Sequence, residues 1–288
     1  MSHLITIDEI VSKTTDLPSM PAAAVRVMRE TEASTSSAAS IAAILAQDQA
    51  LSVRVLRLAN SAFYGLSRKV SDLPEAVVVL GMRSIKNLAM VASTYPWMSR
   101  PLSGYQLGAK EMWIHAFGTA IGAQLIAKRT RSCKDDVAFT AGLLHDIGKV
   151  ALSIWLENKI GAILLYASRE GIPFDAAERK VLGFDHTQVG EQLAMGWNLP
   201  DDITQAIRYH HCPSEVAPPQ PLTDCVHIGN HLTLMMGYGL GGDGVLYNLD
   251  ESALFRLGIR TADLDAIKEV FADSYETYEK LFEDMSAA

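Results

Sequence analysis

The chain has 288 residues, of which 49% are hydrophobic and 20% are charged, and its formal net charge is −8. This length is enough for one large or two modest domains, and the composition is that of an ordinary globular protein. The negative charge argues against direct binding of nucleic acid. The cysteines, Cys133, Cys212 and Cys225, contain no CxxC pair. They argue against a disulfide framework and fit a reducing cytoplasm.

The N-terminus and the apolar stretches predict no contact with a membrane. Residues 1–9 lack a basic segment followed by an apolar one, so no secretory signal is expected. The most apolar stretches, 76–82 and 160–167, are too short to span a bilayer. We therefore expect a cytoplasmic protein.

The first long segment, residues 35–60, has the pattern of one helix. It opens with three good N-cap residues at 35–37 and continues as a broad apolar face without Gly or Pro. Residues 71–74, with Pro74 near the first turn, mark the start of a second helix, which Gly81 should end or bend.

The rest of the chain continues this helical pattern. Further helices are predicted over 83–93, 109–127, 136–155, 158–168, 174–182, 186–195, 201–210 and 222–236. No run alternates apolar and polar residues over the length of a strand. The sequence therefore predicts an all-α protein.

Two segments divide the chain. Residues 95–104 contain two prolines and a glycine, and residues 237–244 contain five glycines and should form a flexible loop. We therefore predict an N-terminal helical subdomain over 1–103 and a second helical subdomain over 104–240. A helical tail over 241–288 would follow, which either packs on the body or serves a partner.

The most informative stretch is residues 142–149, where His145 and Asp146 stand side by side in an otherwise apolar, helical-looking segment. A buried carboxylate is costly unless it is paired or bound to a cation. An imidazole next to a carboxylate is a common way to hold a divalent metal. This pair therefore indicates a candidate metal centre.

Most of the histidines share this part of the chain, and they stand on different predicted helices or helix ends. A helical bundle can project such side chains onto one point, so no compact motif is required. Because the set is rich in imidazole and free of thiolate, it suits Fe, Mn, Zn or Ni. The candidate ligand positions are His115, His145 with Asp146, His186, His210 with His211, and Asn230 or Asp224.

Several histidines also have an interpretation without a metal. His115 has apolar neighbours and could be a core histidine, and His186 could pair with the adjacent Asp185. His210 and His211 close a predicted helix, where a cation complements the helix dipole, so capping explains one of the two. The two histidines not yet discussed lie four residues apart on one helix face, and we expect them to pack in the core or to be exposed. That pair is His227 and His231.

Lys149 follows His145 by four residues on the same predicted helix face. In a phosphohydrolase it could stabilise charge on a phosphoryl oxygen, which would make Lys149 and Asp146 the catalytic residues. Its alternative role is a salt bridge that neutralises Asp146. The sequence favours neither.

Over most of residues 12–240 the chain resembles the HDOD ("HD-related output domain") family of bacterial signalling proteins. The resemblance implies an all-α fold, with an HD-like helical bundle and an N-terminal helical subdomain. It also implies a regulatory or output role in two-component or related systems, with receiver proteins, kinases or cyclic-di-nucleotide enzymes as partners. The residues that carry it are Leu17–Pro21, Asp48 with Leu51, Val55–Tyr64 and Leu80–Leu88.

The second part is similar to the HD and HD-GYP metal phosphohydrolases. By that likeness His115 matches the first histidine and His145–Asp146 the namesake pair, while His186 and His210–His211 match further metal ligands. The implied substrate is a nucleotide or a cyclic dinucleotide.

The sequence departs from those enzymes at two places. Asn230 stands where HD enzymes have a closing metal-binding aspartate, and Asp224, six residues earlier, would face another way. Residues 212–215 lack the acidic and Gly-Tyr-Pro residues of the cyclic-di-nucleotide phosphodiesterases. We therefore predict a signalling module that acts by binding a partner or ligand and has little or no hydrolase activity. The alternative is a metal-dependent phosphohydrolase acting on a nucleotide or cyclic dinucleotide.

Overall fold

The computed structural model describes residues 6–13, 20, 22–242 and 247–286. Within these residues the secondary structure is helical, and the only extended pairing is one isolated bridge between Leu102 and Leu107. The predicted all-α fold is therefore confirmed. Three sequence expectations lie partly outside the described residues: the absence of a signal in 1–9, most of the 17–21 motif, and residues 243–244 of the predicted glycine-rich loop.

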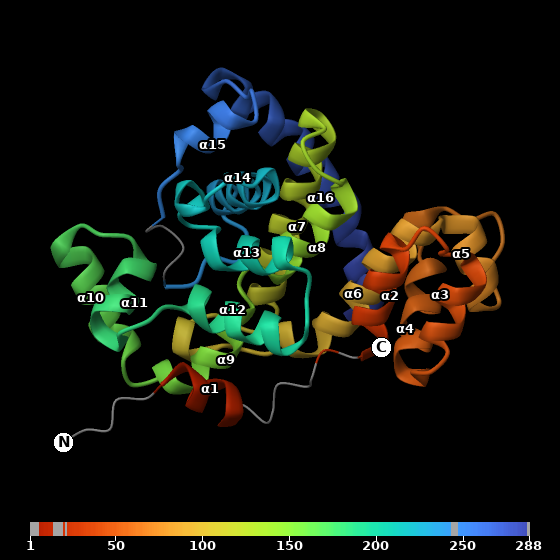
Figure 1. Cartoon of the computed structure of the whole chain (residues 1–288), viewed down its shortest axis with the longest axis horizontal. Coiled ribbons are helices and arrows are strands. Elements are labelled where there is room, and N and C mark those ends of the chain that lie inside the picture. The colour runs from red at the N-terminus through yellow and green to blue at the C-terminus, as the bar shows by residue number, and fades with distance from the viewer. Residues whose placement is uncertain (1–5, 14–19, 21, 243–246, 287–288) are drawn as a thin grey trace. The chain divides into compact units, whose positions relative to one another are not determined.

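The chain divides into two compact units. Unit 1 comprises Met1–Leu17 and Trp97–Phe271, and unit 2 comprises Pro18–Pro96 and Ala272–Ala288. The helices of unit 1 include α1 (Ile7–Lys13), α7 (Glu111–Thr130), α8 (Asp135–Leu144), α9 (Ile147–Leu156), α10 (Ile160–Glu170), α11 (Phe174–Leu182), α12 (His186–Gly196), α13 (Asp201–Tyr209), α14 (Pro221–Met235) and α15 (Glu251–Arg256) (Figure 1). Those of unit 2 include α2 (Ala22–Glu32), α3 (Ala38–Leu45), α4 (Gln49–Ala59) and α5 (Leu73–Leu80). α6 (Met82–Met98) and α16 (Leu264–Ser286) each begin in one unit and end in the other.

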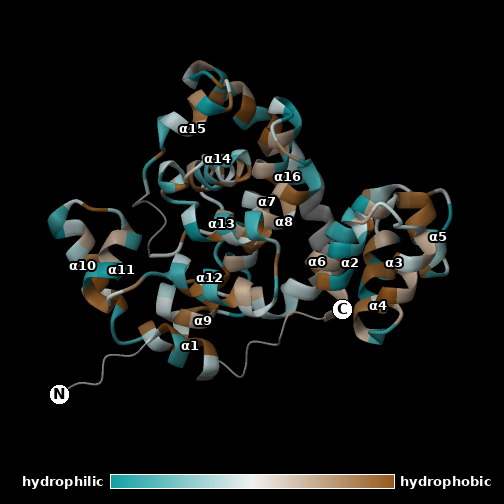
Figure 2. Cartoon of the chain, viewed as in Figure 1, coloured by the Kyte–Doolittle hydropathy of each residue, from teal (hydrophilic) through white to brown (hydrophobic). Residues whose placement is uncertain are grey.

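The predicted single helix over 35–60 is two helices, α3 and α4, so that prediction was wrong. Ser37 opens α3 with a capping box, in which its side chain and that of Ser40 each accept from the other's backbone N–H. Asp48 opens α4 by accepting from the backbone N–H of Leu51 at 2.9 Å. Asp48 is itself an N-cap residue type, so the sequence contained this start signal. In Figure 2 the short α3 is coloured mainly as hydrophobic.

The predicted start and end of α5 are confirmed, whereas α6 is longer than predicted. Asp72 caps α5, Pro74 lies in its first turn, and Gly81 ends it at φ 83°. The next helix does not stop near 93 but runs through Pro96 to Met98. Proline cannot donate to the carbonyl four residues back. The guanidinium of Arg54 donates to that Ala92 oxygen at 3.4 Å instead.

The central helices of unit 1 are α7, which packs against α8 and α14, and α12, which packs against α9 and α13 (Figure 1). The predicted continuous helix over 136–155 was wrong, because a turn at residues 145–146 separates α8 from α9. The stretch Asp135–Leu156 is apolar and long enough for a bilayer, but 89% of its most apolar window is buried. This burial is typical of the core of a soluble protein.

Candidate metal centre

The sequence-predicted ligands come together in unit 1 from four places in the fold. His115 lies in the second turn of α7, and His145 and Asp146 form the turn between α8 and α9. His186 is the first residue of α12, and His210 and His211 directly follow α13. The side chains of His145, His186 and His210 are fully buried, and Asp146 is 1% exposed.

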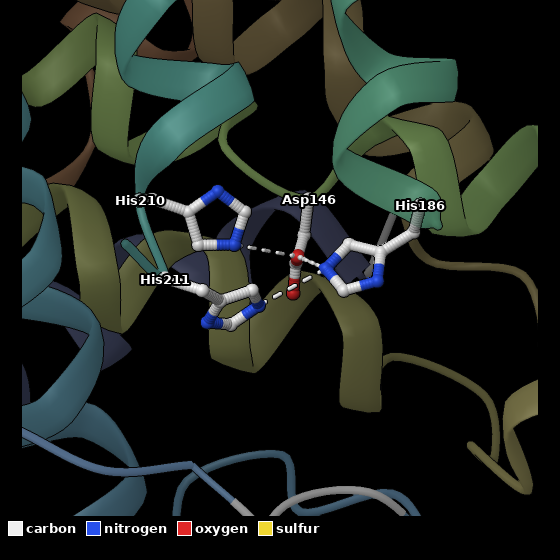
Figure 3. Close-up of side chains that lie close together, drawn as sticks. All are labelled: Asp146, His186, His210 and His211. Atoms are coloured by element: carbon white, nitrogen blue, oxygen red, sulfur yellow. Dashed lines mark hydrogen bonds and ion pairs between the residues drawn. The ribbon is translucent and has the colours of Figure 1, made fainter. Parts of the chain in front are cut away.

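Asp146 stands at the centre of this cluster, with one group of histidines on each carboxylate oxygen. Oδ2 lies 3.5 Å from Nε2 of His115 and 3.3 Å from Nε2 of His145. Oδ1 lies 3.3 Å from Nε2 of His186 and 3.4 Å from Nε2 of His210. Figure 3 shows this second group, in which Nε2 of His211 also approaches Nε2 of His186 at 3.1 Å.

The second ring nitrogen of these buried histidines is bonded to a group outside the cluster. Nδ1 of His145 lies 2.7 Å from the carbonyl oxygen of Gly142, and Nδ1 of His210 lies 2.8 Å from that of Ile207. A carbonyl oxygen only accepts, so each Nδ1 carries a proton, and Nε2 is the ring nitrogen that faces Asp146 and could bind a metal. Metal-binding histidines are commonly oriented in this way.

Three atoms at the centre are buried and have no hydrogen-bond partner: Nε2 of His145, Nε2 of His210 and Oδ1 of Asp146. Buried polar atoms in proteins are nearly always hydrogen-bonded, and exceptions need an explanation. Five imidazoles around one carboxylate form two groups, Asp146 with His186, His210 and His211, and Asp146 with His115 and His145, whose ligand atoms lie within 4.8 Å of one another. This donor set fits a divalent transition metal.

Lys149 belongs to the same site. Its Nζ lies 2.8 Å from Oδ2 of Asp146, so the salt bridge considered from the sequence is present. The lysine is one turn after Asp146 within α9, whereas His145 precedes that helix, which corrects the predicted shared helix face. The ammonium also lies 5.7 Å from the ring centroid of Tyr105 and 5.5 Å from that of Tyr247. Tyr247 in turn stacks on His211, with ring centroids 4.0 Å apart.

Burial and charge set opposite protonation states within the ligand-free cluster. Burial lowers the pKa of His210 to about 3 and that of His211 well below its ordinary value. Burial would also lower the pKa of His186, but Glu178 and Asp146 together raise it to about 10. For Asp146, burial would raise the pKa, but His145 and Lys149 hold it well below its ordinary value.

Four candidates from the sequence have other partners or none. Asp224 forms an ion pair with Arg256 at 2.6 Å, and His227 is buried with both ring nitrogens bonded to backbone groups. His231 is half-buried, and neither metal-ligand grouping includes it. Asn230 is buried, and its Oδ1 lacks a hydrogen-bond partner. The alternative of a surface ion pair between His186 and Asp185 was wrong, because both residues are fully buried and Asp185 caps α12.

Two buried residues at the site escaped the sequence analysis. Glu178 accepts from the phenol of Tyr105 at 2.6 Å and lies 2.5 Å from Nδ1 of His186. Neither residue type carries a metal-site signal by itself, and Tyr105 is 73 residues away in sequence.

Solved structures of three proteins share this fold. An HDOD domain protein of unknown function from Geobacter sulfurreducens is 25% identical, with a TM-score of 0.70 over 92% of this chain and 95% of that one. A provisionally assigned phosphohydrolase from Shewanella amazonensis SB2B is 24% identical, with a TM-score of 0.69 over 96% and 97% of the two chains. A provisionally assigned signal transduction protein from Marinobacter aquaeolei VT8 is 22% identical, with a TM-score of 0.75 over 96% of this chain and 59% of that one.

Sequence comparison gives the family directly. An uncharacterized protein from Treponema pallidum (strain Nichols) is 28% identical over 204 residues, which are 70% of this chain. The alignment spans only 39% of that relative's length. Residues 17–213, more than half of the chain, match the HDOD domain. The chain, with its all-α fold and its buried histidine–aspartate cluster, therefore belongs to the HDOD domain family.

Proposed function

We propose that the chain is a signal-transduction output module in which the cluster around Asp146 holds one or two divalent transition-metal ions, either Fe, Mn, Zn or Ni. The observation that carries the proposal is the pair of histidine groups on opposite oxygens of one buried carboxylate. His115, His145 and Asp146 would hold one ion, and His186, His210, His211 and Asp146 the other. The fold shared with a provisionally assigned signal transduction protein supports the output role.

Within this proposal the module acts by binding and has little or no hydrolase activity. The ammonium of Lys149 already lies on Oδ2 of Asp146, and the ring of Tyr247 covers His211. Asn230 offers a neutral amide, which is a weaker ligand for a hard cation than a carboxylate. The proposed partners are signalling proteins, namely receiver proteins, kinases or cyclic-di-nucleotide enzymes, with a nucleotide as a further candidate ligand.

Elemental analysis of protein purified without a metal-affinity tag tests the metal centre. We expect near-stoichiometric metal in the wild type and its loss in His145→Ala. The matched control is His231→Ala, which removes a half-buried histidine that is outside both ligand groups. Metal-free wild type, or equal metal in the wild type and both variants, would rule out the proposed centre.

A metal-dependent phosphohydrolase is the second candidate, and the arrangement around Asp146 favours it. A carboxylate that offers one oxygen to each of two groups is typical of two-metal sites. Bound ions would supply Lewis acidity toward a phosphoryl oxygen. Lys149 would then balance the negative charge that develops on the phosphoryl group. Asp146 would contribute one oxygen to each ligand group and so hold the two groups at a fixed separation. The substrate would be a nucleotide or cyclic dinucleotide.

Hydrolysis of bis(p-nitrophenyl) phosphate and of a cyclic dinucleotide, each with added Mn²⁺ or Fe²⁺, distinguishes the two candidates. A binding module predicts equal, background rates for the wild type and Asp146→Asn. A metal-dependent rate that is lost in Asp146→Asn and kept in His231→Ala would instead establish the hydrolase.

A further inference from the structure

Glu178 is a fully buried carboxylate on α11 that forms hydrogen bonds with Tyr105 and with His186 of the candidate metal centre. Its Oε1 accepts from the phenol of Tyr105 at 2.6 Å. Its Oε2 accepts from the backbone N–H of His186 at 3.1 Å and lies 2.5 Å from Nδ1 of the same residue. A buried carboxylate is stable only with such compensation.

Glu178 forms its ion pair with His186 and not with the neighbouring arginine. Arg179 follows it in the sequence, but this guanidinium pairs with Asp175 at 2.7 Å and with Asp185. The imidazole of His186 therefore lies between two carboxylates, with Nδ1 toward Glu178 and Nε2 toward Oδ1 of Asp146 at 3.3 Å.

This arrangement differs from that of the other ligands. The outer nitrogens of His145, His210 and His115 face backbone carbonyl oxygens at 2.7, 2.8 and 3.3 Å. A carbonyl fixes the ring but carries no net charge. A carboxylate in the same place also raises the basicity of the histidine as a ligand, and loss of such an outer partner commonly weakens metal binding about 10- to 100-fold.

We propose that Glu178 is the positioning residue of the centre, which sets the ring orientation and ligand strength of His186 toward the metal held with His210 and His211. This inference rests on the proposed metal centre. Tyr105 supports this role, because its hydroxyl donates a hydrogen bond to Oε1 of Glu178, the oxygen that does not contact His186. The residue before Tyr105, Gly104, lets the backbone of this turn pack closely against α9, because a Cβ there would lie 2.0 Å from the backbone oxygen of Ser153.

The test uses Mn²⁺ as the probe and separates the two ligand groups. His115→Ala removes a ligand of the first group, so Mn²⁺ titration of this variant reports the group of His186. Adding Glu178→Gln, a neutral isostere, should weaken that affinity about 10- to 100-fold. Adding Glu178→Asp, which keeps the charge, should restore part of it. Adding Glu157→Gln should change nothing, because Glu157 is exposed and binds the same turn through Ser103 without touching a histidine.

A readout independent of metal comes from the ¹⁵N shifts of the His186 ring in the metal-free protein. Glu178→Gln should change its protonation and tautomer, while leaving the ring of His210 as it is. Tyr105→Phe removes only one hydrogen bond and should weaken Mn²⁺ binding a few-fold, which provides a milder variant should Glu178→Gln fail to fold.

The outcomes separate this inference from the proposed function. If the wild type binds no metal by elemental analysis or Mn²⁺ titration, both ideas fail. If the wild type and His115→Ala bind Mn²⁺ but Glu178→Gln and Tyr105→Phe bind it equally well, the metal centre stands and the role of Glu178 is overturned.

Discussion

His227 shows how one hydrogen bond at each ring nitrogen keeps a buried histidine neutral in this protein. Its Nδ1 lies 2.7 Å from the carbonyl oxygen of His210, and its Nε2 accepts from the backbone N–H of Asp250 at 2.8 Å. A second proton would place a donor against a donor, so the neutral ring is required. Burial lowers the pKa of His227 to about 4.

This shift predicts a loss of stability in acid. An unfolded histidine has a pKa of about 6.5, so the unfolded chain binds the extra proton between about pH 6.5 and 4. The contribution of His227 to the free energy of unfolding is therefore complete above pH 6.5 and is lost as the pH falls toward 4. From pH 7 to pH 5 the free energy of unfolding should fall by about 2 kcal/mol through this residue.

Urea unfolding with EDTA at pH 7 and at pH 5 measures this contribution. The difference in unfolding free energy between the wild type and His227→Gln should narrow by about that 2 kcal/mol. The half-buried His231, changed to Gln, should give a smaller narrowing. If the difference in unfolding free energy between the wild type and His227→Gln is the same at both pH values, the lowered pKa of His227 is contradicted.

At the scale of single residues, the sequence indicated the candidate ligands but not the residues that orient them. Histidines and an aspartate in an apolar run stand out by residue type, and the cluster brings together His115, His145, Asp146, His186, His210 and His211. Glu178 and Tyr105 were missed because each becomes significant only through a tertiary contact. Likewise, the backbone carbonyls that orient His145 and His210 carry no sequence signal.

At the scale of elements, the sequence predicted some helix ends correctly but missed the turn that separates α8 from α9. The helix over 174–182 was predicted with its observed bounds, which lie between Pro173 and Gly183. The turn at 145–146 was missed because the apolar pattern continues through it, since both α8 and α9 are buried. Two of the candidate ligands, His145 and Asp146, lie at this interruption, which hydrophobic periodicity does not report.

The contact between α9 and α12 depends on Gly148. A Cβ added there would lie 1.8 Å from the backbone oxygen of His186 and 2.7 Å from the backbone nitrogen of Gly190. Gly148→Ala must therefore push α12, and with it His186, away from Asp146. We expect a loss of about 1–3 kcal/mol in unfolding free energy from overpacking, together with weaker metal binding.

Gly161→Ala in α10 is the matched control, because no atom lies within 4 Å of a Cβ built at that position. Alanine is the better helix former, so this control should be neutral or stabilising by up to about 1 kcal/mol. Thermal unfolding and Mn²⁺ titration of both variants provide the comparison. Equal behaviour of the two variants would show that the close approach at Gly148 is unimportant.

At the scale of the whole molecule, the candidate ligands come from distant parts of the chain. α7, the α8–α9 turn, α12 and the end of α13 each contribute to the cluster, over residues 115–211. An ion bound only by the folded protein stabilises it by mass action, by about 2.7 kcal/mol at a free concentration of 100 Kd. For a unit of this size, that corresponds to roughly 5–10 °C in melting temperature.

Chelation should therefore lower the melting temperature of the wild type by about that 5–10 °C. Asp146→Asn, which lacks the central carboxylate, should not respond to chelator. Hydrogen exchange shows which helices the ion stabilises, and chelation should reduce amide protection in α7, α9, α12 and α13. α2 to α5 belong to unit 2 and contribute no ligand, so their protection should stay unchanged. A metal-loaded wild type that loses its metal without any change in melting temperature or in protection would show that the ion does not hold these helices together.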